Sequence, residues 1–162
     1  MKDEFIEQIN KHQGILQKIC NIYFYHNSYK EDYFQEILIR VWKAYPSFRN
    51  ESAFSTWLYR IALNTAIDII RKQSLQPQYV ELSILEYNIS ESDDNTTSDM
   101  SDQLYEAIHQ LSDTEKAIIL LHLEEYNYRE IAEIIGISEG NAGVRISRIK
   151  KQLVKILENG KH

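Results

Sequence analysis

The sequence predicts an all-α protein with two small helical modules joined by a flexible acidic linker. Apolar residues recur at helical spacing through most of the 162 residues, and no segment shows a convincing strand alternation. Capping boxes, in which a serine that starts a helix is followed three residues later by glutamate, occur in both halves of the chain. Between the helical stretches, serine, aspartate, asparagine and threonine replace the apolar residues, which is typical of a flexible segment.

The overall composition is that of a globular protein, because 43% of the residues are hydrophobic and 26% are charged. The single cysteine excludes a framework of internal disulfides and fits a reducing compartment. No apolar run approaches the roughly 20 residues of a membrane-spanning helix, and the first residues do not resemble a signal peptide. We therefore expect a cytoplasmic protein with no membrane contact of its own.

The net charge of −6 does not exclude nucleic-acid binding, because the acidic excess is confined to the middle of the chain. Residues 76–112 contain eight Asp or Glu and no Lys or Arg. Residues 1–75 contain ten basic and eight acidic residues, and residues 113–162 contain eight of each. We predict a first module at 1–75, an acidic flexible linker at 76–101 and a second module at 102–162.

In the first module, one helix is predicted to begin at Ser28, with Glu31 completing its capping box, and to end near Pro46. Its core stripe comprises Phe34, Ile37, Leu38, Val41 and Tyr45. The opposite face comprises Asp32, Gln35, Glu36, Ile39 and Lys43. An isoleucine among acidic and amide side chains indicates a protein-contact surface, with a solvated face and one isolated isoleucine as the alternative.

A second helix is predicted to follow Ser52 or Ser55. Its core stripe comprises Phe54, Leu58, Ile61, Ala62, Thr65 and Ile69. Off this stripe lie Trp57, Arg60, Asn64, Ile67, Asp68 and Arg71, followed by Lys72. Asp68 is expected to pair with Arg71 or Lys72 along the same helix.

The second module opens with Leu104, Ile108 and Leu111 on one helical face, and a capping box at Ser112 and Glu115 begins a helix that ends at Leu123. Two further helices, at Tyr128–Ile135 and Glu139–Leu157, are separated by a tight turn. The first of these has an inner face of Ile131, Ala132 and Ile135. Gly136 is suited to ending that helix, and Ser138 to capping the next. This pattern predicts a helix-turn-helix, with an ordinary helical hairpin as the alternative.

The last helix has an apolar side and a polar side. The apolar side comprises Ala142, Ile146, Ile149, Leu153 and Ile156. The candidate DNA contacts are Ser138, Asn141, Arg145, Arg148, Lys151 and Lys155, with Gln152 beside them. We expect Asn141 and Arg145 to reach base edges and the later cations to bind phosphates, with a solvated helix face as the alternative.

Two segments of the chain resemble the extracytoplasmic-function (ECF) sigma factors of bacterial RNA polymerase. Asp32–Lys72 is similar to the promoter-melting module of that family, and Leu111–Leu153 is similar to its −35-reading module. The resemblance implies a sigma factor that binds core RNA polymerase and directs initiation at specific promoters. The alternative is a stand-alone helix-turn-helix regulator, which would need a dimer interface or a ligand domain.

The resemblance also implies roles for the predicted faces. The face around Ile39 is assigned to the coiled coil of the polymerase β′ subunit, with the β subunit as a further partner. The −10 element is assigned to the second helix and the loop before it. Because flipped bases need stacking surfaces, amides and cations, the candidates there are Phe48, Arg49, Asn50, Phe54, Arg60, Asn64, Arg71 and Lys72. Trp42, Phe54 and Trp57 are individually more typical of a core.

An anti-sigma factor that covers these surfaces is a further implied partner. The linker is implied to thread a polymerase channel, with a passive spacer as the alternative. The chain departs from the family at Asn141, Ala142 and Gly143, where many members have Thr, Val and Lys. Gly143 lowers helix propensity by about 1 kcal/mol, and the missing lysine leaves the −35 sequence undefined.

Neither catalysis by this chain nor a bound cofactor or metal is expected. The five histidines and Cys20 do not have metal-ligand spacing. The sequence contains no glycine-rich phosphate loop and no nucleophile elbow. The polymerase would supply the chemistry.

Overall fold

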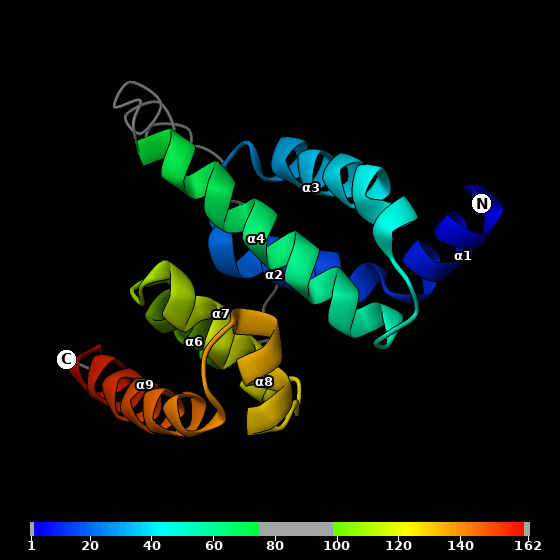
Figure 1. The fold of residues 1–162 in the computed structure, drawn as a ribbon. Helices are drawn as coiled ribbons and strands as arrows, with labels where there is room; N and C mark the ends of the chain where they lie inside the picture. Colours follow the sequence, from blue (N-terminus) through cyan, green and yellow to red (C-terminus); the bar gives the residue numbers. More distant parts are fainter. Residues whose placement is uncertain (1, 75–98, 161–162) are drawn as a thin grey trace. The chain divides into compact units, whose positions relative to one another are not determined.

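A computed structural model describes residues 2–74 and 99–160, with the side chains of 2–73 and 102–160. Within these ranges the regular elements are all helical, as predicted, and they form two compact units (Figure 1). The predicted linker lies outside the described residues except at its end, where residues 99–101 already belong to a helix.

The first unit contains α1 (Lys2–Lys11), α2 (Gln13–Tyr23), α3 (Lys30–Ala44), the short 3-10 turn η1 (Tyr45–Ser47) and α4 (Phe54–Ser74). Helix α4 packs against both α2 and α3, and its predicted stripe is buried apart from the half-buried Ile61. The fully buried side chains of this core include Leu16, Ile19, Ile37, Val41, Leu58 and Ala62. Cys20 belongs to this core, where burial raises the pKa of its thiol to about 11.

The start of α3 differs from the prediction. Its N-cap residue is Tyr29, which makes no side-chain cap hydrogen bond, so Ser28 and Glu31 do not frame the first turn as a capping box. The side chain of Asn27 forms the turn instead, because its Oδ1 accepts a hydrogen bond of 2.8 Å from the Tyr29 backbone N–H. The helix ends before Pro46, as predicted, and continues into η1.

The second unit contains α6 (Asp99–His109), α7 (Asp113–Leu123), α8 (Tyr128–Ile135) and α9 (Glu139–Asn159). The predicted capping box is confirmed: Ser112 Oγ accepts from the Glu115 N–H at 3.3 Å, and Glu115 Oε1 accepts from the Ser112 N–H at 3.0 Å. A second box, formed by Asn127 and Glu130 at 2.8 and 2.9 Å, starts α8. This second box was not predicted from the sequence.

The helix-turn-helix is confirmed in its backbone. Gly136 ends α8 in the left-handed conformation, with φ of +88°, and Ser138 Oγ accepts a hydrogen bond of 3.1 Å from the Asn141 N–H at the start of α9. The inner face of α8 differs by one residue, because Ile134 is buried and Ile135 is only half-buried. Helix α8 contacts both α7 and α9, so its buried face is broader than a single stripe.

Gly136→Ala is expected to destabilise the second unit by about 1–2 kcal/mol, because a left-handed conformation costs an L-residue that much. Gly140→Ala is the matched control, since Gly140 lies in the first turn of α9 and a Cβ there meets nothing within 4 Å. Thermal unfolding followed by circular dichroism should give a lower Tm for the first variant and an equal or higher Tm for the second. Equal Tm values for Gly136→Ala and the unchanged protein would contradict the role of this turn.

Candidate nucleic-acid interface

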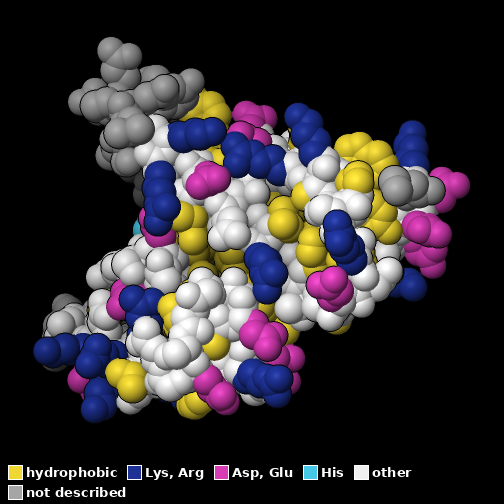
Figure 2. Space-filling view, viewed as in Figure 1, with side chains coloured by type: hydrophobic (Ala, Val, Ile, Leu, Met, Phe, Trp, Pro, Cys, Tyr) yellow, Lys and Arg dark blue, Asp and Glu magenta, His cyan; other side chains and the backbone are white. Residues whose placement is uncertain are grey.

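Helix α9 presents one exposed face opposite its buried row. The buried row comprises Ala142, Ile146, Ile149 and Leu153. With about 100° between successive helical residues, the direction opposite this row falls close to Val144, whose side chain is 49% exposed. The exposed residues around it are Asn141, Ser147, Arg148, Lys151 and Lys155. Figure 2 shows lysine and arginine side chains gathered over the C-terminal half of this helix.

Most of the predicted DNA contacts lie on this exposed surface. Ser138, Asn141, Arg148, Lys151 and Lys155 are exposed, whereas Arg145 is half-buried at the edge of the face. The predicted face was centred on the charged residues and therefore lies to one side of the exposed face. Val144 and Ser147 were not among the predicted contacts, although the direction opposite the apolar row identifies them.

Gly143, the departure from the family pattern, has a packing role. A Cβ at Gly143 would lie 3.2 Å from Cε2 and 3.3 Å from Cδ2 of Tyr128, the first residue of α8. The absence of a side chain at Gly143 thus lets the Tyr128 ring lie against α9. A lysine at this position would require the Tyr128 ring to shift by a few tenths of an ångström.

Aromatic side chains cluster where α3 leads through η1 into α4. Phe54 is only 7% exposed, and its ring centroid lies 5.6 Å from that of Phe48, 5.5 Å from Trp57 and 5.3 Å from His12. Phe54 is therefore a core residue here, and its ring is not available to stack on a base, contrary to its place among the −10 candidates. Phe48 is half-buried, and Trp42 keeps an exposed edge.

The other −10 candidates lie on the surface of the first unit. Arg49 and Asn50 are exposed in the loop before α4, where Asn50 has a positive φ of 57°. An open hollow of about 410 Å³ lies beside this loop, bordered by Glu4 and Glu7 of α1. The exposed candidates on α4 are Arg60, Asn64, Arg71 and Lys72.

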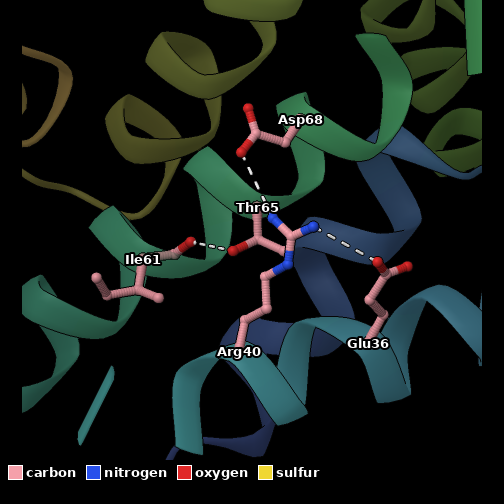
Figure 3. A network of polar contacts seen from close by, with 5 residues as sticks. All are labelled: Glu36, Arg40, Ile61, Thr65 and Asp68. Atoms are coloured by element: carbon pink, nitrogen blue, oxygen red, sulfur yellow. Dashed lines mark hydrogen bonds and ion pairs between the residues drawn. The ribbon is translucent and has the colours of Figure 1, made fainter. Parts of the chain in front are cut away.

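Arg40 links α3 to α4 (Figure 3). Its guanidinium lies 3.6 Å from Glu36 Oε1 on the same helix and 3.4 Å from Asp68 Oδ2 on α4. Asp68 was predicted to pair with Arg71 or Lys72 along α4, and the ion pair found for it is this one with Arg40 of α3. The face around Ile39 and the exposed side of α4 are thus joined by one ion-pair network.

The face of α3 proposed for protein contact is exposed. Ile39 is 51% exposed, Asp32, Gln35 and Lys43 are exposed, and Glu36 is half-buried. Within the described parts of the chain, no group of three His, Cys, Asp or Glu side chains could hold a metal ion. No helix among these residues is long and apolar enough to cross a membrane.

Comparison with known proteins identifies both units. Residues 8–76 match the family description sigma-70 region 2, and residues 101–153 match sigma-70 region 4. The ECF RNA polymerase sigma-E factor of Haemophilus influenzae is 32% identical over 134 residues, which are 75% of this chain and 71% of that protein. The chain belongs to the ECF sigma factors. As such it directs transcription initiation at specific promoters, and the match to region 2 beside that to region 4 favours this function over the stand-alone regulator.

Further relatives extend this similarity. The sigma factor SigW of Bacillus subtilis is 28% identical to this ECF sigma factor, over 98% of this chain and 91% of the relative. The fold resembles that of the sigma factor RpoE of Bartonella quintana, solved with the anti-sigma factor NepR, with a TM-score of 0.70, 23% identity and 98% of each chain covered. It also resembles CnrH, solved with the cytosolic domain of CnrY, with a TM-score of 0.66, 19% identity and coverage of 98% and 90%.

Proposed function

We propose that the two modules of this ECF sigma factor divide promoter recognition between them. Residues 1–75 bind core RNA polymerase and open the −10 element, and residues 102–162 read the −35 element. Residues 76–98 form the acidic linker between them, since residues 99–101 belong to α6. The polymerase supplies the chemistry, and the complex acts in the cytoplasm.

The exposed face of α9 is the main observation that supports this proposal. An N-capped helix follows the turn of a helix-turn-helix and presents an amide and three cations, Asn141, Arg148, Lys151 and Lys155, on one exposed face. Amide and guanidinium groups in the first turns suit base edges, and cations further along suit phosphates. Because Arg145 is half-buried at the edge of the face and Arg148 is exposed on it, this proposal gives the base contact expected of Arg145 to Arg148 and a flanking contact to Arg145.

The first unit supplies the other contacts of the proposal. Asp32, Gln35, Glu36, Ile39 and Lys43 meet the β′ coiled coil, with the β subunit as a further contact. Phe48, Arg49, Asn50, Arg60, Asn64, Arg71 and Lys72 engage the opened −10 strand. Because the structural neighbour RpoE of Bartonella quintana was solved with an anti-sigma factor, we also propose that an anti-sigma factor covers these surfaces.

Arg148→Ala should weaken binding of the holoenzyme to its −35 element about tenfold, because a guanidinium contact to a base is worth about 1–3 kcal/mol. The affinity for core polymerase without DNA should be unchanged. Lys150→Ala is the matched control, since it removes one charge from the same helix at an exposed position outside the face.

Fluorescence anisotropy of the labelled protein with core polymerase, and then of the holoenzyme with promoter fragments, measures both affinities. Loss of core binding in Arg148→Ala, or equal −35 losses in the two variants, would contradict the division of labour. Absence of any saturable binding to core polymerase would overturn the proposed function itself.

A further inference from the structure

Val144 is an apolar side chain at the centre of the proposed DNA-reading face. It is 49% exposed, with Asn141 three residues before it and Arg148 four residues after it on the same side of α9. A single exposed valine on an ordinary surface needs no explanation. This valine, however, lies in the row whose amide and guanidinium neighbours are placed for base edges.

The side chain of Val144 is not covered by side chains at two neighbouring positions of α9. Gly140, one turn earlier, has no side chain, and a Cβ built there would meet nothing within 4 Å. Gly143 also has no side chain, and the Tyr128 ring lies against it. Because valine is β-branched, its rotamer in a helix is nearly fixed. The two methyl groups therefore form a rigid apolar contact surface in the first turns of α9.

Only one base suits such a surface. Each base pair presents hydrogen-bonding groups in the major groove, but thymine alone adds an apolar group, its C5-methyl. Valine has no side-chain donor or acceptor, so it gains from burying a methyl group. It also leaves the polar edges of other bases without partners, which is unfavourable.

We propose that Val144 is a specificity-determining residue that packs against the C5-methyl group of a thymine in the −35 element. This inference rests on the proposed reading of −35 by α9 and names the base that the helix selects. The glycine at position 143, where many family members have a lysine, leaves Val144 as the apolar contact at this end of α9.

The test uses the holoenzyme assembled from the full chain and core polymerase. Promoter fragments randomised at −35 are selected by binding, and the selected sequence is synthesised with deoxyuridine in place of each thymine in turn. This replacement removes one methyl group and keeps the hydrogen-bonding pattern. At one position the unchanged protein should lose about fourfold in affinity, the worth of one buried methyl group.

Two variants test whether this loss of affinity depends on Val144. Val144→Ala should bind the thymine and deoxyuridine fragments within about twofold of each other, because the two γ-methyl groups that pack against the thymine methyl are gone. Val154→Ala is the matched control, since Val154 lies on the same helix, is 54% exposed and is ten residues further along. It should retain the fourfold loss.

A selected −35 element without thymine, no loss at any deoxyuridine position, or the same loss in Val144→Ala would each overturn the inference while leaving −35 reading by α9 intact. Failure of the holoenzyme to select any −35 sequence would instead overturn the proposed function. The two failures are therefore distinguishable.

Discussion

Replacing Ile39 with aspartate is expected to weaken binding to core RNA polymerase about 100-fold and to leave the first unit folded. Ile39 is 51% exposed, so a carboxylate there remains hydrated in the free protein. In the complex the carboxylate would be buried at an apolar contact, which costs about 2–5 kcal/mol at a protein interface. Lys43, one turn further along the same face, is exposed, and an ion pair with it would not remove this cost because both charges would have to be desolvated.

Ile6→Asp is the matched control for Ile39→Asp. Ile6 lies on α1 of the same unit and is 45% exposed, so the substitution changes charge and apolar area to a similar extent. Anisotropy titration with core polymerase should show a loss of less than about threefold for this control. If Ile39→Asp bound as tightly as the unchanged protein, the α3 face would not be the docking surface. Equal losses in both variants would indicate a general charge effect.

Local signals predicted the second unit almost completely. These signals are capping residues, the glycine at the end of α8 and helical spacing, and each depends only on residues close together in the sequence. As a result, α7 and α8 have the predicted bounds. Such signals do not predict the structure where two neighbouring residues could each cap or form the same turn. At the start of α3, Asn27 and Ser28 can each organise the turn, and the hydrogen bond from Tyr29 to Asn27 decides between them.

The contacts that sequence could not predict join residues far apart in the chain. Arg40 and Asp68 are separated by 28 positions, and no periodic pattern pairs them. Tyr128 and Gly143 meet only because the turn at Gly136 sets the crossing of α8 and α9. Val144 was not predicted for another reason. The predicted face was chosen by its charged residues and was therefore centred near Arg145, whereas the direction opposite the core is defined by the apolar row alone.

Replacing Ile118 with alanine is expected to unfold the second unit in a large fraction of molecules and to leave the first unit folded. Ile118 is fully buried in α7, and removing such a side chain costs about 2–5 kcal/mol. The second unit spans only residues 99–160 among the described residues. A core of that size supplies no more than about 3–5 kcal/mol, so the substitution consumes most of its stability.

The two units can be followed separately, because both tryptophans, Trp42 and Trp57, lie in the first. Circular dichroism of Ile118→Ala should therefore show lost helix while tryptophan fluorescence stays native. Leu123→Ala, at an exposed leucine of the same helix, should change neither signal. The holoenzyme should still form through α3 but lose its preference for −35. Simultaneous loss of both spectroscopic signals would mean that the units unfold as one, and the proposed division at residues 76–98 would then be wrong.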